Sequence, residues 1–75
     1  MKAILYIVIP CYNEEEVLPV TSGLFLEELL LLIKKEKISQ KSRILFVNDG
    51  SRDRTWEIIE KLARENPYFI GKPTI

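Results

Sequence analysis

The chain contains one stretch in which a short apolar run ends abruptly in a polar turn, Ile44-Leu45-Phe46-Val47-Asn48-Asp49-Gly50-Ser51. The run does not alternate in its middle, which favours a strand over residues 43–48 that is buried on both faces of a parallel sheet. In α/β proteins, ligands bind at the carboxyl ends of such strands, so a carboxylate at Asp49 would be placed to contact a nucleotide or sugar. The alternative is a tight turn in which Asp, Gly and Ser serve only as turn residues. This stretch alone supports both interpretations equally.

A second strand-and-loop pattern opens the chain. Residues 3–9 form a continuous apolar run rich in β-branched side chains, which predicts another strand buried on both faces. Pro10 is expected to end this strand, because proline cannot donate a hydrogen bond to a sheet. Polar residues 11–16 then form a loop at the carboxyl end of the strand.

A helix is predicted between the two strands. It is expected to begin near Pro19, which suits the first helical turn, and to end at the lysines of residues 34–37, whose charges suit the negative end of the helix dipole. Its leucine-rich surface is broad enough to predict that the helix is covered on more than one side.

A second helix is predicted from about Arg54 to Glu65, with Thr55 in its buried stripe. Asp53 or Ser51 is the expected N-cap, and an Asn-Pro pair stops the helix. Residues 68–70 could begin a third strand, but Gly71-Lys72-Pro73 is expected to break it almost at once.

The order β-α-β-α predicts an α/β fold in which the two strands are parallel and joined by a right-handed crossover. Parallel pairing should bring residues 10–14 and 48–51 to the same end of the sheet. Such a set suits a uracil-type base, with Tyr12 as a ring to stack on, Asp49 as an acceptor for a ring N–H and Glu14 as an acceptor for ribose hydroxyls. The structural alternatives are an aromatic that covers the helix for Tyr12 and a helix-dipole partner for Glu14. The glycine-rich phosphate-binding motifs are missing, which disfavours a dinucleotide or P-loop site.

The composition excludes several other classes of function. The 75 residues include 11 basic and 11 acidic side chains and no His, so no nucleic-acid partner is expected. The single Cys11 cannot form an internal disulfide, which predicts a cytoplasmic chain. Without a His to activate it, Cys11 is expected to act as a small apolar residue rather than a nucleophile. The apolar residues 24–33 are interrupted by two Glu and are too few to span a membrane.

Two segments resemble the opening signatures of family 2 glycosyltransferases: Ile7-Val8-Ile9-Pro10-Cys11-Tyr12-Asn13-Glu14-Glu15 and Phe46-Val47-Asn48-Asp49-Gly50-Ser51-Arg52-Asp53-Arg54-Thr55. The resemblance implies a GT-A (Rossmann-like) donor domain of an inverting enzyme that takes a sugar from a nucleotide diphosphate sugar, and a UDP-sugar is the donor expected for this chain. The Val-Asn-Asp-Gly-Ser version is similar to the branch that transfers sugars to polyprenyl phosphate lipids, beside the dolichol-phosphate mannose synthases.

The resemblance also implies roles for individual positions. Pro10, Tyr12 and Glu14 match the family's first nucleotide-contacting loop, and Asp49 matches the acidic residue that meets the base. Gly50 and Ser51 are expected to shape the turn. Asp53 matches a frequent motif Asp, although capping of the second helix would explain it equally well.

The chain departs from the family's pattern toward its end. Members continue with an Asp-x-Asp motif that holds Mg²⁺ or Mn²⁺, a catalytic base and an acceptor site, and this sequence contains none of them. Residues 1–75 are therefore expected to be one partial domain, the N-terminal part of a donor domain, with no catalytic residue, no metal ligand and no bound cofactor of its own. The resemblance is expected to fade after Phe69. The full-length parent is expected to be membrane-associated, with a lipid acceptor and a catalytic domain facing the cytoplasm.

Two other functions fit the same sequence. The chain could be a non-catalytic nucleotide-binding module, or a structural fragment that self-associates. Two βα units leave an unpaired strand and uncovered leucine surface, so a homo-oligomer is expected.

Overall fold

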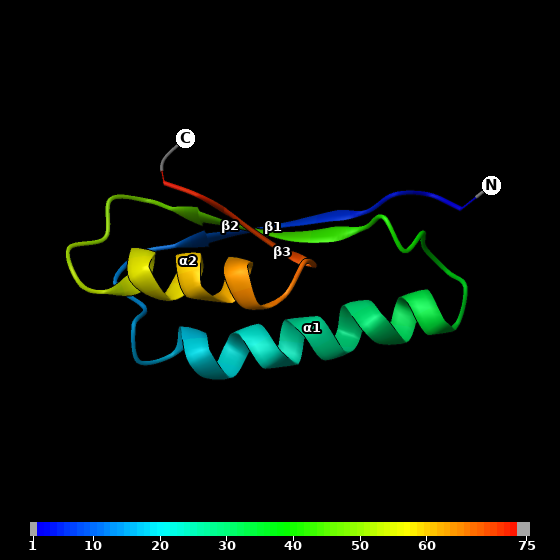
Figure 1. Ribbon diagram of the computed structural model, residues 1–75, viewed down its shortest axis with the longest axis horizontal. Helices are drawn as coiled ribbons and strands as arrows, with labels where there is room; N and C mark the ends of the chain where they lie inside the picture. The colour runs from blue at the N-terminus through cyan, green and yellow to red at the C-terminus, as the bar shows by residue number, and fades with distance from the viewer. Residues whose placement is uncertain (1, 74–75) are drawn as a thin grey trace.

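The computed structural model describes residues 2–73, which form a three-stranded parallel sheet and two helices (Figure 1). The elements in chain order are β1 (Tyr6–Cys11), α1 (Leu18–Lys34), β2 (Arg43–Asn48), α2 (Thr55–Glu65) and β3 (Phe69–Lys72). The strands lie in the order β1-β2-β3, and both pairs are parallel. The predicted α/β class with parallel strands is confirmed, and β2 has its predicted bounds.

Both helices lie on the same face of the sheet (Figure 1). This follows from right-handed crossovers that step twice in the same direction across the sheet. The core lies between this face and the helices, and its largest fully buried side chains are those of Phe46, Leu18, Leu29, Ile44 and Ile59.

The first strand differs from its prediction in extent and in burial. It begins at Tyr6 rather than at residue 3, and Pro10 lies within it, opposite Val47 of β2. Because β1 is an edge strand of the described sheet, the missing N–H of proline leaves no unmade sheet bond there. Tyr6 and Val8 are both 59% exposed, so burial on both faces was wrong for this strand. The reason is that neither described helix covers the face on which they lie.

Helix α1 is buried along one stripe only. Leu18, Ser22 and Leu29 are buried against the core, whereas Leu24 and Leu31 are exposed. The prediction that this helix is covered on more than one side is therefore wrong for the part of the chain that the structure describes. Neither helix in residues 2–73 is long and apolar enough to cross a membrane.

Helix α2 begins one residue later than predicted. Arg54 occupies the N-cap position and makes no side-chain capping bond. The prediction that Asp53 or Ser51 is the N-cap is therefore wrong. Asp53 nevertheless satisfies the first helical N–H, because its Oδ1 accepts from the backbone N–H of Thr55 at 2.9 Å.

The third strand is longer than predicted and includes the glycine that was expected to break it. Strand β3 pairs with β2 from Phe69 to Lys72. A Cβ on Gly71 would lie 2.5 Å from Cγ2 of Ile59, so glycine allows β3 to pass directly beneath α2. The rings of Phe46 and Phe69 pack with their centroids 5.3 Å apart and join β3 to the core.

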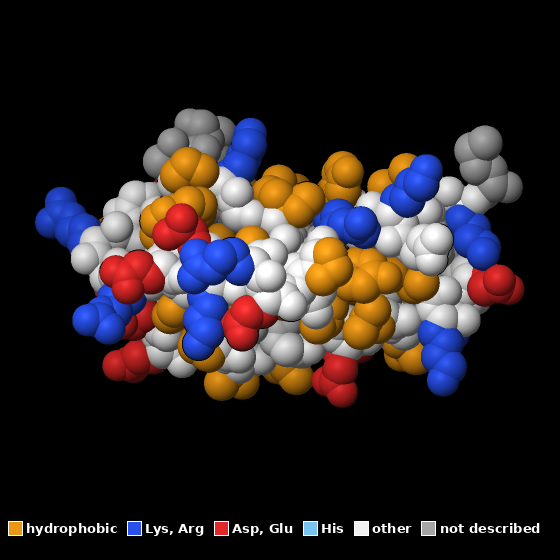
Figure 2. Space-filling model, in the orientation of Figure 1, with side chains coloured by type: hydrophobic (Ala, Val, Ile, Leu, Met, Phe, Trp, Pro, Cys, Tyr) orange, Lys and Arg blue, Asp and Glu red, His pale blue; other side chains and the backbone are white. Residues whose placement is uncertain are grey.

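The face of the sheet opposite the helices is apolar. Tyr6 and Val8 of β1 and Ile70 of β3 are exposed there, and hydrophobic side chains follow the upper border of the molecule over the sheet (Figure 2). No described element of residues 2–73 packs on this face.

Candidate site at the carboxyl end of the sheet

Two loops meet where β1 and β2 end, as predicted from their parallel pairing. Residues 12–17 (loop 1) follow β1, and residues 49–54 (loop 2) follow β2. Cys11 and Asn48 are register partners, and the backbone N–H of Asp49 donates to the carbonyl oxygen of Cys11 at 2.8 Å. Tyr12 and Asp49 therefore leave the sheet side by side.

The four residues assigned to nucleotide binding all lie at this end. Pro10 is exposed at the end of β1, Tyr12 is 56% exposed, and Asp49 is also exposed. Glu14 is half-buried, and its carbonyl oxygen accepts from the backbone N–H groups of Val17 and Leu18 at the start of α1. The structure thus brings their loops together, while their contact with a nucleotide stays a prediction.

Side chains of loop 2 and of the α2 start hold the backbone of loop 1. Three consecutive N–H groups donate across the gap: Asn13 to Ser51 Oγ at 3.0 Å, Glu14 to Thr55 Oγ1 at 2.7 Å, and Glu15 to Asp53 Oδ2 at 3.2 Å. In the reverse direction, the backbone N–H of Arg52 donates to Asn13 Oδ1 at 2.8 Å.

Sequence reasoning assigned Ser51 to the turn or the helix cap, Asp53 to the helix cap and Thr55 to the buried stripe of α2. It missed the bonds that these side chains make to loop 1. The only signal was an alternating series of oxygen-bearing side chains, Ser51-x-Asp53-x-Thr55. This series does not reveal its partners, which lie 38 to 41 residues away.

The turn after β2 is shaped by its own residues. Gly50 has φ +75°, a left-handed conformation that glycine adopts without a steric penalty. The buried Asn48 accepts the backbone N–H of Ser51 on its Oδ1 at 3.1 Å. Asn13 in loop 1 also has a left-handed φ of 48°, which asparagine tolerates better than most residues. The geometric role predicted for Gly50 is thus supported, and Asn48 acquires a structural role.

Two side chains at this end have shifted pKa values. The pKa of Asp53 is lowered, mainly because the Thr55 hydroxyl donates a hydrogen bond to its carboxylate. Partial desolvation raises this pKa, whereas hydrogen bonds from backbone N–H groups, including those of Thr55 and Glu15, lower it further. Burial and, to a lesser extent, the nearby Glu14 carboxylate raise the pKa of the Cys11 thiol to about 11. Cys11 is fully buried and its thiol is protonated at neutral pH, as expected for a small apolar residue.

The residues present do not fit a divalent metal. Within residues 2–73, no group of three or more His, Cys, Asp or Glu side chains is arranged to hold a metal ion. Mg²⁺ and Ca²⁺ sites are built from several oxygen ligands, and Asp49 supplies one carboxylate.

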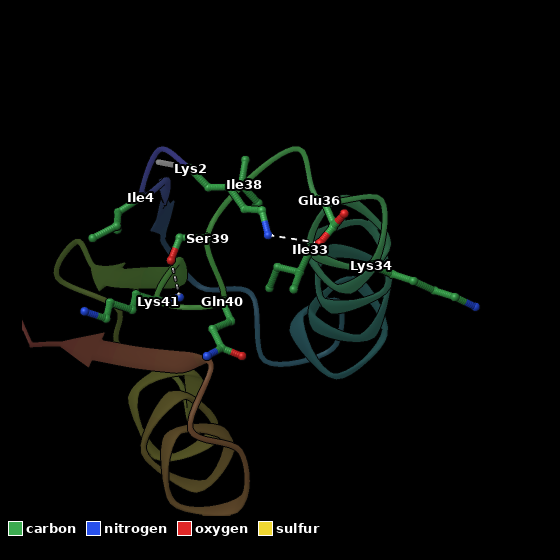
Figure 3. A pocket seen from close by; sticks show the side chains of 9 residues that line it. All are labelled: Lys2, Ile4, Ile33, Lys34, Glu36, Ile38, Ser39, Gln40 and Lys41. Atoms are coloured by element: carbon green, nitrogen blue, oxygen red, sulfur yellow. Dashed lines mark hydrogen bonds and ion pairs between the residues drawn. The ribbon is translucent and has the colours of Figure 1, made fainter.

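A hollow lies at the other end of the sheet. It has a volume of about 860 Å³, and Ile4, Ile33 and Ile38 supply its apolar walls. Lys2 reaches across it to Glu36, with Nζ and Oε1 3.2 Å apart, whereas Lys34 and Lys41 extend away from it (Figure 3). None of the predicted nucleotide-binding residues lines this hollow.

Comparison with known proteins identifies the chain's relatives. Residues 6–72 match the profile of Glycosyl transferase family 2, so the match extends past Phe69, where the resemblance was expected to fade. The chain is 52% identical over 70 residues to the uncharacterized glycosyltransferase YkoT of Bacillus subtilis (strain 168), which covers 93% of this chain and 21% of that protein. No solved structure matches it significantly.

Two further relatives carry the names of specific transferases. The chain is 41% identical over 74 residues to the dolichyl-phosphate beta-glucosyltransferase ALG5A of Trichomonas vaginalis, covering 92% of this chain and 22% of that protein. It is also 41% identical over 64 residues to the undecaprenyl-phosphate 4-deoxy-4-formamido-L-arabinose transferase of Photorhabdus laumondii, covering 85% and 18%. The chain therefore spans about a fifth of the length of the curated relatives that it matches.

Proposed function

Because this chain belongs to glycosyl transferase family 2, we propose that the carboxyl end of its sheet forms the nucleotide-binding part of an enzyme that transfers a sugar from a UDP-sugar. The acceptor in the complete enzyme is a polyprenyl phosphate. This choice is supported by relatives named as dolichyl-phosphate and undecaprenyl-phosphate transferases, over the part that this chain covers.

The joined loops carry the proposal. Tyr12 and Asp49 are both exposed directly after register-paired residues, so an aromatic ring and a carboxylate stand at one end of the sheet. The Tyr12 ring offers a face on which a base stacks. The Asp49 carboxylate accepts the N3–H of uracil, and Glu14 accepts from ribose hydroxyls.

In the complete enzyme, an oxygen of the lipid phosphate attacks the anomeric carbon of the sugar. The bond from that carbon to the diphosphate breaks, UDP leaves, and the configuration at the carbon is inverted. We expect the 75-residue chain alone to bind nucleotide without transferring sugar. Release of UDP from a UDP-sugar by the purified chain, in the presence of a polyprenyl phosphate, would contradict this expectation.

Titration with UDP and CDP, followed by NMR, tests the binding proposal. Amide shifts should change at residues 12–14 and 49–50. CDP should bind roughly tenfold more weakly or worse, because N3 of cytosine is an acceptor and faces the Asp49 carboxylate unpaired.

Matched variants locate the site. Tyr12→Ala should reduce UDP binding, whereas Tyr6→Ala, which removes an equally exposed tyrosine from the uncovered sheet face, should leave it unchanged. Asp49→Asn should abolish the preference for UDP over CDP. Equal binding of both nucleotides by the unaltered chain, or no binding at all, would overturn the proposal.

Self-association is a second candidate, favoured by the uncovered sheet face with its exposed Tyr6, Val8 and Ile70. An unpaired edge strand beside an apolar face is a surface on which a second copy can pack. Sedimentation velocity should then show a dimer or larger species that Val8→Lys dissociates. A monomer at all concentrations would count against this candidate.

A further inference from the structure

We propose that Ser51, Asp53 and Thr55 are positioning residues whose side chains hold loop 1 in the shape in which Tyr12 and Glu14 meet the same ligand as Asp49. This inference rests on the proposed function, since the ligand is the nucleotide assigned above. The three side chains and the N–H groups of residues 13–15 that they accept are called the loop clasp below.

Loop 1 depends on the loop clasp because its own backbone does not satisfy these N–H groups. Within residues 2–73, no backbone carbonyl accepts from the N–H of residues 13–15. Their acceptors are the three side-chain oxygens, at distances of 2.7 to 3.2 Å. Removing one of these oxygens leaves an N–H of loop 1 with water as its only remaining partner.

Two of the three bonds in the loop clasp, those made by Thr55 and Asp53, are joined in a connected ring. The Thr55 hydroxyl accepts from the Glu14 N–H and donates to Asp53 Oδ1, while Asp53 Oδ2 accepts from the Glu15 N–H. Thr55 is fully buried as the first residue of α2, so the ring is anchored to the core through the helix. Loop 1 is thereby fixed relative to α2 and to Asp49, which directly follows the strand that leads into loop 2.

The position of the loop clasp along loop 1 explains why it bears on binding. Its three N–H groups belong to residues 13–15, which directly follow Tyr12 and include Glu14. Tyr12 and Glu14 are the two residues of loop 1 whose side chains are assigned to the ligand. The large core side chains, such as Phe46 and Ile59, take no part in it. Loosening the loop clasp should therefore free loop 1 while the sheet and helices persist.

Thr55 offers a matched set of variants. Thr55→Val keeps the shape of the side chain and removes the hydroxyl, whereas Thr55→Ser restores it. Thr21→Val is the control, because the Thr21 hydroxyl lies within α1 and donates only to the Val17 carbonyl, at 3.3 Å. Ser51→Ala provides a second test at a partly exposed position, should Thr55→Val fail to fold.

Amide hydrogen exchange and UDP titration are the measurements. Thr55→Val should speed amide exchange at Glu14 and Glu15 roughly fivefold or more and should weaken UDP binding by a similar factor. The loss of one typical hydrogen bond changes an equilibrium constant by about this factor. Exchange at Phe46 should not change. Thr55→Ser should restore both properties, and Thr21→Val should alter neither.

The outcomes separate this inference from the proposed function. Unchanged exchange at residues 13–15 in both Thr55→Val and Ser51→Ala would overturn it. Faster exchange with unchanged UDP affinity would also overturn it, since the loop clasp would then have no positioning role. If the unaltered chain does not bind UDP, the proposed function fails, and the ligand part of this inference fails with it. Amide exchange then still decides whether the loop clasp holds loop 1.

Discussion

The two ends of the sheet are built in different ways. At the carboxyl end, four hydrogen bonds between side chains and backbone join loop 1 to loop 2 and α2. At the amino end, the connection from α1 to β2 borders an open hollow, and an exposed ion pair crosses it. One buried hydroxyl, that of Ser42, ties the start of the chain to this connection by accepting the Leu5 N–H at 2.9 Å.

Charge follows the same division. Residues 34–43 together with Lys2 carry six Lys or Arg and one Glu. The two loops at the carboxyl end instead carry five acidic and two basic side chains. In these loops the short side chains of Asn13, Ser51 and Asp53 bond to backbone at close range. Short polar side chains thus fix the loops of the carboxyl end, whereas the amino end carries mainly long, exposed cations.

Gly71→Ala should produce the largest effect and should act on the carboxyl end. The added Cβ would lie 2.5 Å from Ile59, a fully buried side chain, so α2 must shift away from β3. Overpacking of this kind costs about 1–3 kcal/mol of unfolding free energy. Urea denaturation measures the loss, and NMR shifts should change more at the start of α2 than at Ser42.

Gly23→Ala is the matched control for that prediction. Gly23 lies within α1, and a Cβ there would have no heavy atom within 4 Å. Replacing a helical glycine by alanine should therefore raise the unfolding free energy by roughly 0.5–1 kcal/mol. Equal losses from both substitutions would show that the close approach at Gly71 is not what matters.

Ser42→Ala tests the amino end by itself. It leaves the N–H of Leu5 without its acceptor in a partly buried bond, which should cost about 1–2 kcal/mol of unfolding free energy. Amide exchange should rise at Leu5 and stay unchanged at residues 13–15. Faster exchange at both ends would show that the two ends are coupled through the sheet and are not independent.

Sequence reasoning succeeded where the signal is local. The bounds of β2 and the start of α1 near Pro19 follow from apolar runs, prolines and polar turns that are read within a few residues. It failed where burial or strand pairing depends on residues that are distant in the sequence. The exposure of Val8 depends on which face the helices cover, and Gly71 belongs to a strand because it pairs with Phe46 of β2.

The candidate site shows the same limit. Parallel pairing of the two predicted strands is enough to place Tyr12 and Asp49 at one end of the sheet, because their strands end in register. The bonds that shape loop 1 join residues about 40 positions apart, and no periodic pattern marks such pairs. The sequence therefore assigned Ser51, Asp53 and Thr55 only local roles, in the turn, in helix capping and in the buried stripe of α2.

Acidification should loosen the carboxyl end through Asp53. Because its hydrogen bonds lower the pKa of Asp53 below that of the unfolded chain, the carboxylate stabilises the fold above about pH 4. This stabilisation is lost as the pH falls below that value and through the lowered pKa. The amide proton shifts of Glu15 and Thr55 should follow the titration of Asp53.

Asp53→Asn separates this effect from the other carboxylates of the loops. The variant keeps Glu14, Glu15, Glu16 and Asp49 but has no titrating group at position 53. Its Glu15 and Thr55 amide shifts should lose the low-pH transition, while amide shifts at Leu5 should behave as in the unaltered chain. A transition that survives the substitution would assign the pH response to a neighbouring carboxylate.

The smallest effect is expected from the ion pair at the amino end. The side chains of Lys2 and Glu36 are 48% and 75% exposed, so water screens their attraction and both lose conformational freedom when they pair. A double-mutant cycle with Lys2→Gln and Glu36→Gln should give a coupling below about 0.5 kcal/mol. Glu28→Gln, at an exposed position on α1, is the control for loss of charge alone.

Backbone contacts explain why so little is expected there. The N–H of Ser39 donates to the Ala3 carbonyl at 2.8 Å, and that of Arg43 donates to the Leu5 carbonyl at 3.0 Å. These bonds, with the Ser42 hydroxyl, hold the first residues against the connection whether or not Lys2 meets Glu36. A coupling above about 1 kcal/mol would mean that charged side chains also shape the amino end, and the contrast between the two ends would then be one of degree.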